Sequence, residues 1–102
     1  MQDRLGQANV LKARGDLAQA TEDWTAALRW YEEALPIYGA VQDRVGASNV
    51  YAEFAKVRSQ TGAFEEARVA ATTARSLGAQ CHNRYAVAVA EQVLAALAQP
   101  SP

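Results

Sequence analysis

The feature that most constrains this chain is an internal repeat forty residues long. Shifting the sequence by forty positions superimposes 3–6 (DRLG) on 43–46 (DRVG) and Asn9-Val10 on Asn49-Val50. The same register, without a gap, pairs four further positions: Thr21 with Thr61, Trp24 with Phe64, Ala27 with Ala67, and Ala34 with Ala74. A third start follows at Asn83-Arg84-Tyr85. A fixed period of this length predicts stacked supersecondary units, each of which needs its neighbours to bury its apolar face.

The segment 23–38 indicates what each unit is made of. Its apolar residues recur at steps of three and four, as on one face of an amphipathic helix: Trp24, Ala27, Leu28, Tyr31, Ala34, Leu35 and Tyr38. Polar side chains occupy the opposite face: Thr25, Arg29, Glu32 and Glu33. The small alanines permit helices to approach closely, and we expect the large rings of Trp24 and Phe64 to fill the space beside them.

Capping residues divide the chain into five expected helices, near residues 4–20, 23–38, 44–60, 63–77 and 83–98. Asp3 and Asp43 are good N-caps, and Gly39 and Gly78 fit C-terminal caps. Pro36 lies inside the second helix, where it predicts a kink or a 3₁₀ finish because proline lacks a backbone donor. Loops this short allow only antiparallel neighbours. We therefore expect an all-α single domain over 1–102, with repeats at 3–42 and 43–82 and a C-terminal capping or half-repeat helix at 83–98.

The apolar helix face and the small residues of the first unit resemble the signature of a tetratricopeptide repeat. The residues that carry the resemblance are Leu11, Gly15, Trp24, Ala27, Tyr31, Ala34 and Leu35. The second unit keeps part of that signature: Tyr51, Ala55, Phe64, Ala67 and Ala74. The forty-residue spacing resembles the long repeats of large bacterial regulatory and signalling proteins. The resemblance implies a short right-handed α-solenoid of stacked hairpins that serves as a protein-interaction module within such a protein. The chain departs from the signature at four positions, which bears on its packing: Arg14, Ala18, Arg58 and Ala71.

Composition and charge limit the classes of partner. Of 102 residues, 50% are hydrophobic and 21% charged, as in a folded globular domain. The formal net charge of −1 disfavours broad contact with nucleic acid or an anionic membrane, and we expect neither partner. The apolar run 86–98 is interrupted by Glu91 and Gln92 and is too short to cross a bilayer. Because Cys81 is the sole cysteine and no charged-then-apolar leader follows Met1, we expect a cytoplasmic protein.

Residue types that commonly carry catalysis occur here in settings that favour a structural role. His82 adjoins Cys81, but a structural zinc site needs about four ligands and the sequence has no other histidine or cysteine. Glu32-Glu33 and Glu65-Glu66 are adjacent pairs, which point about 100° apart on a solvated helix face. No Gly-rich loop follows a strand to hold phosphate. We therefore expect no enzyme activity, no catalytic residue, no metal and no cofactor.

A binding surface is the better functional candidate. In proteins that this chain resembles, the first helices of successive repeats line a concave groove for an extended peptide or a partner helix. The matching positions here are polar and of mixed charge: Asn9, Lys12, Asp16, Asn49 and Lys56. Asparagine can donate to and accept from any peptide backbone, and the two lysines could select acidic partners. Family members that grip a C-terminal carboxylate match at Lys12, but Asp16 and Glu53 would repel that group.

The C-terminal helix points to a different class of function. Tyr85, Val89, Val93 and Leu97 form one apolar line, and Val87 and Leu94 fall on a second face. A solenoid normally ends in a helix whose outer face is polar. We therefore expect Val87 and Leu94 to stay exposed in a single chain and to form a homodimer. This supports the alternative function, a structural or self-association module that stacks on copies or on neighbouring domains and leaves its groove empty.

Overall fold

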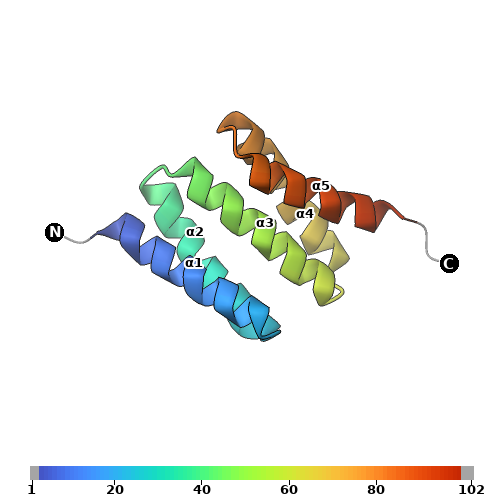
Figure 1. The fold of residues 1–102 in the computed structure, drawn as a ribbon, viewed down its shortest axis with the longest axis horizontal. Helices are drawn as coiled ribbons and strands as arrows, with labels where there is room; N and C mark the ends of the chain where they lie inside the picture. The colour runs from blue at the N-terminus through green and yellow to red at the C-terminus, as the bar shows by residue number, and fades with distance from the viewer. Residues whose placement is uncertain (1–2, 100–102) are drawn as a thin grey trace.

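The computed structural model describes residues 3–99, which form five α-helices and no strand (Figure 1). The helices are α1 (Arg4–Ala20), α2 (Trp24–Ala40), α3 (Arg44–Gln60), α4 (Phe64–Gln80) and α5 (Arg84–Ala98). α1 and α2 form one antiparallel hairpin, α3 and α4 form a second that stacks on the first, and α5 packs on the second. α1, α3 and α5 make up the front layer in Figure 1, and α2 and α4 lie behind them. The all-helical fold of stacked hairpins predicted from the sequence is confirmed.

Every connection between helices is a three-residue turn of the same form. Its middle residue has a positive φ: 61° at Glu22, 58° at Gln42, 82° at Gly62 and 58° at His82. Its third residue donates its backbone N–H to the carbonyl five residues earlier, as Asp23 does to Ala18 at 2.8 Å. In three of the four turns this third residue also caps the next helix with its side chain: Asp23, Asp43 and Asn83. Helices of 17 residues alternating with such turns give the forty-residue period without a gap.

The four equivalent turns allow a matched test of backbone strain. A residue other than glycine loses roughly 1 kcal/mol in the left-handed region, and Gly62 is the glycine of the set. We expect Gln42→Gly to raise the free energy of unfolding by up to about 1 kcal/mol, and Gly62→Ala to lower it by a similar amount. Urea melts followed by circular dichroism measure both variants. Shifts of the same sign in the two would contradict this account of the turns.

The expected C-terminal caps at Gly39 and Gly78 are wrong. α2 and α4 continue through both glycines, and the left-handed residues that follow these helices are Gln42 and His82. Neither residue type marks a helix end, so the sequence carried no signal for them. Gly78 instead permits a close approach between α4 and α5, because a methyl group there would lie 3.1 Å from Cγ2 of Val87.

Of the two outcomes expected at Pro36, the 3₁₀ finish is wrong, because α2 remains α-helical for four further residues. Proline deprives the carbonyl of Glu32 of its helical partner. Pro36 and Glu32 are both exposed, so water can satisfy that carbonyl. Tyr38, which follows the proline, is buried and anchors the last turn in the core. Burial of the last turn thus outweighs the loss of one solvent-facing hydrogen bond.

The core consists of two clusters with different side-chain sizes. The tyrosine cluster lies between the first hairpin and α3 and contains Ala8, Ala27, Tyr31, Ala34, Tyr38, Ala47, Val50 and Val57. The alanine cluster lies between α3, α4 and α5 and contains Ala52, Ala55, Ala67, Ala70, Ala71, Ala74, Ala86, Val89, Ala90 and Val93. Ala71, at the position of Tyr31 one repeat later, is therefore part of a consistently smaller core.

Phe64 does not fill space in the core as expected, since 55% of it is exposed. Its counterpart Trp24 is half-buried and lies along the same groove as Lys56, Ser59 and Gln60 near the end of α3. One repeat later, Ala96 stands at the position of Lys56, and α5 already ends at Ala98. The end of α5 therefore has no large side chain to cover Phe64 as the end of α3 covers Trp24.

Candidate functional site

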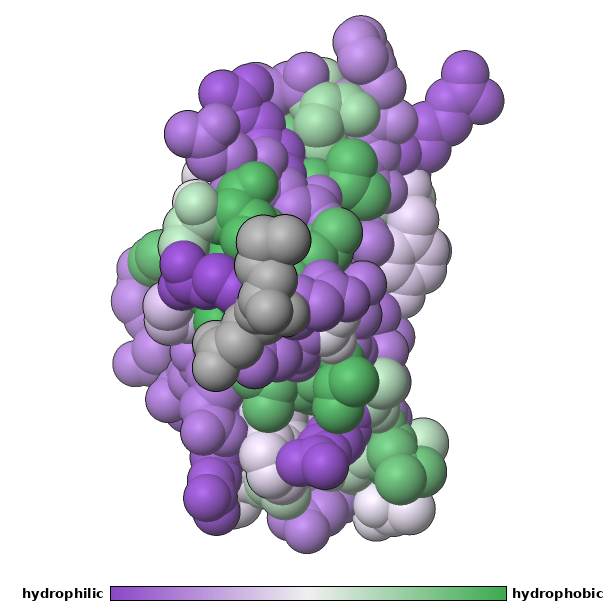
Figure 2. All heavy atoms as spheres, turned by 90° about the vertical axis from the view of Figure 1, so that its left-hand side faces the viewer, coloured by the Kyte–Doolittle hydropathy of each residue, from purple (hydrophilic) through white to green (hydrophobic). Residues whose placement is uncertain are grey.

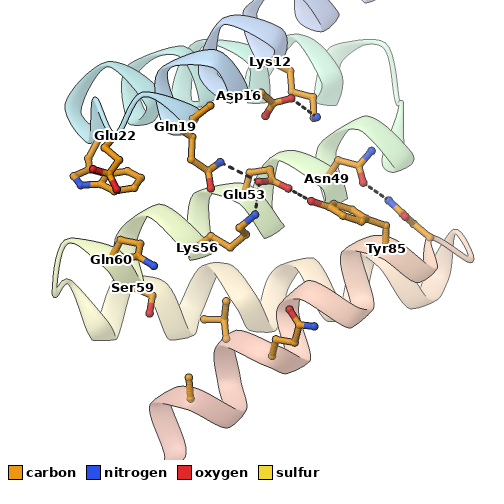
Figure 3. A pocket seen from close by; sticks show the side chains of 16 residues that line it. Lys12, Asp16, Gln19, Glu22, Asn49, Glu53, Lys56, Ser59, Gln60 and Tyr85 are labelled. Carbon is orange, nitrogen blue, oxygen red and sulfur yellow. Dashed lines mark hydrogen bonds and ion pairs between the residues drawn. The ribbon is translucent and has the colours of Figure 1, made fainter.

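A groove of about 800 Å³ lies between α1, α3 and α5 (Figure 3). Most of its lining is polar: Lys12, Asp16, Gln19, Glu22, Asn49, Glu53, Lys56, Ser59, Gln60, Asn83, Tyr85 and Gln92. The apolar remainder is Ala20, Trp24, Val93 and Ala96. On α1 and on α3 the polar residues recur at steps of three and four, which places them on one face of each helix. Because the first helices of the repeats share one layer, these faces meet along a common surface.

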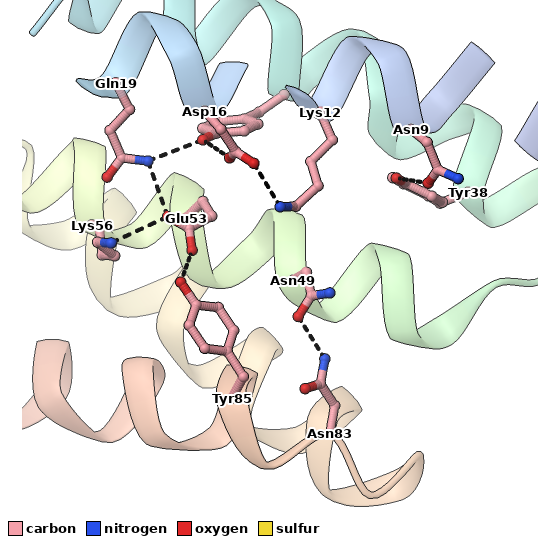
Figure 4. A network of polar contacts seen from close by, with 11 residues as sticks. Asn9, Lys12, Asp16, Gln19, Tyr38, Asn49, Glu53, Lys56, Asn83 and Tyr85 are labelled. Atoms are coloured by element: carbon pink, nitrogen blue, oxygen red, sulfur yellow. Dashed lines mark hydrogen bonds and ion pairs between the residues drawn. The ribbon is translucent and has the colours of Figure 1, made fainter. Parts of the chain in front are cut away.

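Glu53 forms the centre of the groove and joins three helices (Figure 4). The residue is only 5% exposed, and a buried carboxylate is costly unless donors surround it. Oε1 accepts from Nε2 of Gln19 on α1 at 3.0 Å and from Nζ of Lys56 at 3.2 Å. Oε2 accepts from the hydroxyl of Tyr85 on α5. Glu53 therefore fixes the spacing of α1, α3 and α5.

Asp16 forms a second polar centre, which is linked to the first. The Tyr31 hydroxyl donates to Oδ1 of Asp16 at 2.6 Å, and Nζ of Lys12 donates to Oδ2 at 2.7 Å. Nε2 of Gln19 donates to the Tyr31 hydroxyl oxygen at 2.9 Å as well as to Glu53. One amide group thus connects both carboxylates through its two hydrogens.

The tyrosine hydroxyls in this network act as donors over a wide pH range. Burial, followed by the hydrogen bond to Asp16, raises the pKa of the Tyr31 hydroxyl far above its ordinary value. Burial, followed by the hydrogen bond to Glu53, does the same to the pKa of Tyr85. Both hydroxyls therefore keep their protons at neutral pH and continue to occupy the carboxylate oxygens.

A sequence model described as a tetratricopeptide repeat matches residues 6–80. The chain belongs to the tetratricopeptide repeat family. A search of curated proteins finds no match. Tetratricopeptide repeats generally mediate interactions between proteins, so a protein partner follows from the family. The groove between α1, α3 and α5 is formed by the first helices of the successive repeats in this tetratricopeptide fold.

Each repeat places one asparagine on this side of the solenoid. Oδ1 of Asn9 accepts from the Tyr38 hydroxyl at 2.6 Å, and Oδ1 of Asn49 accepts from Nδ2 of Asn83 at 2.7 Å. Both side chains are thereby held by their oxygens. Within residues 3–99, the Nδ2 group of neither asparagine has a hydrogen-bond partner. These two amide groups are therefore available to a ligand.

At the centre of the groove, the acceptor atoms of Asp16, Glu53 and Asn49 are occupied, whereas donor hydrogens of Asn49, Lys12 and Lys56 remain. The carboxylate oxygens of Asp16 and Glu53 and the amide oxygen of Asn49 already accept hydrogen bonds from the chain. Lys12 and Lys56 each use one ammonium N–H on a neighbouring carboxylate, and an ammonium group has three. A ligand that presents acceptors, such as peptide carbonyl oxygens, suits this arrangement.

The structure brings together four of the five residues predicted for the groove. Lys12, Asp16, Asn49 and Lys56 line it, whereas Asn9 is exposed on α1 outside the lining. Each of the two lysines predicted to select acidic partners forms an ion pair within the chain, Lys12 with Asp16 and Lys56 with Glu53, and their preference for acidic partners stays a prediction. Much of their charge is therefore neutralised inside the groove.

Sequence reasoning missed Gln19 and Tyr85 as groove residues. Gln19 follows Lys12 and Asp16 at helical spacing, so the periodicity carried that signal. Tyr85 was assigned to the apolar line of α5, yet it is half exposed and its hydroxyl contacts Glu53. In the repeat register it corresponds to Val45, so the repeat gave no indication that this position carries a polar group.

The expected exposure of Val87 and Leu94 is wrong. Both are half-buried: Leu94 packs against the alanine cluster, and Val87 lies against Gly78. They stand forty residues after Ala47 and Phe54, which pack into the tyrosine cluster in the same way. Apart from Tyr85, the exposed residues of α5 are polar or small: Arg84, Ala88, Glu91, Gln92, Ala95, Ala96 and Ala98. The basis for a homodimer through Val87 and Leu94 is therefore lost.

Two other properties concern the described part of the chain. Among residues 3–99, no three or more His, Cys, Asp or Glu side chains are grouped so that they could hold a metal ion. No helix there is long and apolar enough to span a membrane.

Proposed function

We propose that the groove between α1, α3 and α5 binds an extended peptide segment or a helix of a partner protein. The observation that carries the proposal is the division of hydrogen-bonding groups. The carboxylate oxygens of Asp16 and Glu53 accept from the chain's own donors, whereas Nδ2 of Asn49 lacks a partner within residues 3–99. A backbone carbonyl is an acceptor present in every peptide, so this division supports recognition of a main chain.

The charges of the groove favour an internal peptide segment over a free C-terminus. Its lining contains three carboxylates, Asp16, Glu22 and Glu53, against two ammonium groups, Lys12 and Lys56. An additional carboxylate would meet like charges in a partly desolvated site. A carbonyl oxygen carries only a partial charge and avoids this cost.

The test uses peptides selected from a random displayed library against the purified protein, followed by calorimetry. We expect Asn49→Ala to weaken an enriched peptide by about tenfold, because the loss of one well-formed hydrogen bond is on the order of 1.4 kcal/mol. Lys56→Gln should weaken it less, and it is preferable to Lys56→Glu, which would place a second carboxylate beside Glu53.

Glu33→Gln is the matched control, because Glu33 is an exposed residue of α2 and does not line the groove. It should leave the affinity unchanged. Enriched peptides that bind the Asn49→Ala protein as tightly as the wild type would place recognition elsewhere. Circular dichroism of each variant separates loss of binding from loss of fold.

A further inference from the structure

α1 carries a second apolar face in addition to the one that enters the core. Gly6, Val10, Ala13 and Leu17 follow one another at intervals of four, three and four residues, the spacing of a coiled-coil seam. We call these four residues the outer seam. Val10 is 52% exposed and Leu17 is 68% exposed. Figure 2 shows the side of the molecule where the chain begins, and hydrophobic side chains reach the surface there between hydrophilic ones.

The repeat register shows that this face is normally a contact face. In α3 the counterparts of Gly6, Val10 and Leu17 are buried under the first hairpin: Gly46, Val50 and Val57. In α5 the counterparts pack on the second hairpin: Ala86, Ala90 and Leu97. Within the described residues, only α1 leaves the large side chains at these positions exposed, Val10 and Leu17. The outer seam therefore corresponds to a helix-packing surface, but no helix among the described residues packs on it.

We propose that the outer seam binds the outer seam of a second copy of this chain, with the two α1 helices antiparallel about a two-fold axis. In that arrangement Leu17 of one protomer opposes Gly6 of its partner, and Val10 opposes Ala13. Each large side chain faces a small one, and the pattern stays the same when the protomers are exchanged. Self-complementarity of this kind is the requirement for a two-fold interface.

The surface has a hollow beside Gly6, which is the residue that Leu17 of the partner would oppose. The hollow measures about 540 Å³ and is also bordered by Asp3, Gln7, Val10, Leu11 and Ile37. Leu17, the most exposed of the large hydrophobic residues within 3–99, is the side chain that would enter the hollow of the partner. Insertion of a large residue into a hole opposite is the contact by which helices interlock.

The charges around the outer seam permit a second copy to approach. None of its four residues is charged, and the net charge of −1 gives little repulsion between two copies. The carboxylate of Asp3, which borders the hollow, accepts from the backbone N–H of Gly6 at 2.8 Å. The guanidinium of Arg14, next to Ala13, lies over the ring of Trp30 at 5.1 Å. A contact of one helix pair buries less than a standard interface of roughly 1,600 Å², so we expect a dissociation constant on the order of 100 μM.

Sedimentation equilibrium on the full chain from about 10 μM to 1 mM tests the proposal, since this range brackets the expected constant. The wild type should change from monomer to dimer. Leu17→Glu should raise the dissociation constant about a hundredfold, because the change is made twice in the dimer. Val69→Glu is the matched control, as Val69 is 60% exposed on α4, and it should leave the dimer intact.

A size exchange within the outer seam tests the antiparallel pairing. Val10→Ala alone leaves a gap opposite Ala13 of the partner. Ala13→Val alone places a valine opposite Val10 of the partner, where there is too little space for both. Each single change should therefore weaken the dimer about tenfold. The double variant restores a large residue opposite a small one and should recover the wild-type constant. A wild type that remains monomeric at 1 mM overturns the proposal, even if another protein binds the outer seam. A Leu17→Glu protein that dimerises normally, a double variant that fails to recover, or open-ended assembly overturns it too.

Discussion

Gly46→Ala is expected to lower the free energy of unfolding by about 3 kcal/mol, at the upper end of the range for overpacked cores. The reason is the ring of Tyr38, which packs directly on the α-carbon of Gly46, so that an added methyl group would overlap the ring. Tyr38 is only 1% exposed, and its hydroxyl is held by Asn9, so the ring has no free space into which it can move. The two hairpins must therefore separate, and urea melts measure the loss.

Gly39→Ala provides the matched control for this prediction. Gly39 also lies inside a helix, but nothing lies within 4 Å of a methyl group placed there. Its replacement should raise stability by roughly 0.5–1 kcal/mol, because alanine loses less backbone entropy in a helix. Equal effects of the two variants would mean that helix propensity, and not the contact with Tyr38, governs Gly46.

Gly15→Ala should resemble Gly46→Ala, since the ring of Tyr31 covers Gly15 in the same way. The two tyrosine–glycine contacts differ in what they join. Tyr31 and Gly15 belong to one hairpin, whereas Tyr38 and Gly46 join successive hairpins. The second contact sets the angle of stacking and hence the form of the groove. Gly46→Ala should therefore also weaken a groove ligand, which Gly15→Ala should affect less.

The sequence predicted the helices and their order because both depend on local patterns. The apolar stripes and the aspartate N-caps lie in the sequence itself, and all five helices begin within one residue of their expected starts. The helix ends were less predictable. Glu22, Gln42 and His82 adopt a left-handed conformation that their residue types do not favour, so the turn is imposed by packing on both sides of it.

The groove was predictable by position but not by chemistry. Helical spacing and the repeat placed Lys12, Asp16, Asn49 and Lys56 on one surface. The hydrogen bonds from Gln19 and Tyr85 to Glu53 join residues 34 and 32 positions apart. Such pairings depend on how far α1 and α5 stand from α3, which no local pattern specifies. They decide that the carboxylate oxygens of Glu53 are occupied by donors of the chain itself.

The faces of α5 illustrate a different limit. Periodicity identified Val87 and Leu94 as one apolar face but did not say which neighbour covers it. Applying the forty-residue register to their counterparts, Ala47 and Phe54, would have assigned this face to the preceding hairpin. A periodic pattern defines a face, and only the repeat defines its partner.

Glu53→Gln is expected to lower the free energy of unfolding by about 2 kcal/mol, within the range for hydrogen bonds to charged groups. The variant keeps the size of the side chain, so no cavity forms. It removes the charge that pairs with Lys56, and its amide N–H₂ would confront one of two donors, the Tyr85 hydroxyl or Nε2 of Gln19. Because Glu53 is only 5% exposed, the loss should persist in 1 M salt, which screens exposed pairs.

A double-mutant cycle with Tyr85→Phe shows whether this loss arises in the network that joins α3 to α5. Tyr85→Phe removes the donor to Oε2 of Glu53, so the two changes share one hydrogen bond. Their combined effect should be smaller than the sum by roughly 0.5–1.5 kcal/mol. Pairing Glu53→Gln with Glu33→Gln instead should give additive effects, because Glu33 is exposed on α2 and its contact with Arg29 is an exposed ion pair at 4.0 Å. Additivity in both cycles would show that Glu53 does not couple α5 to the groove.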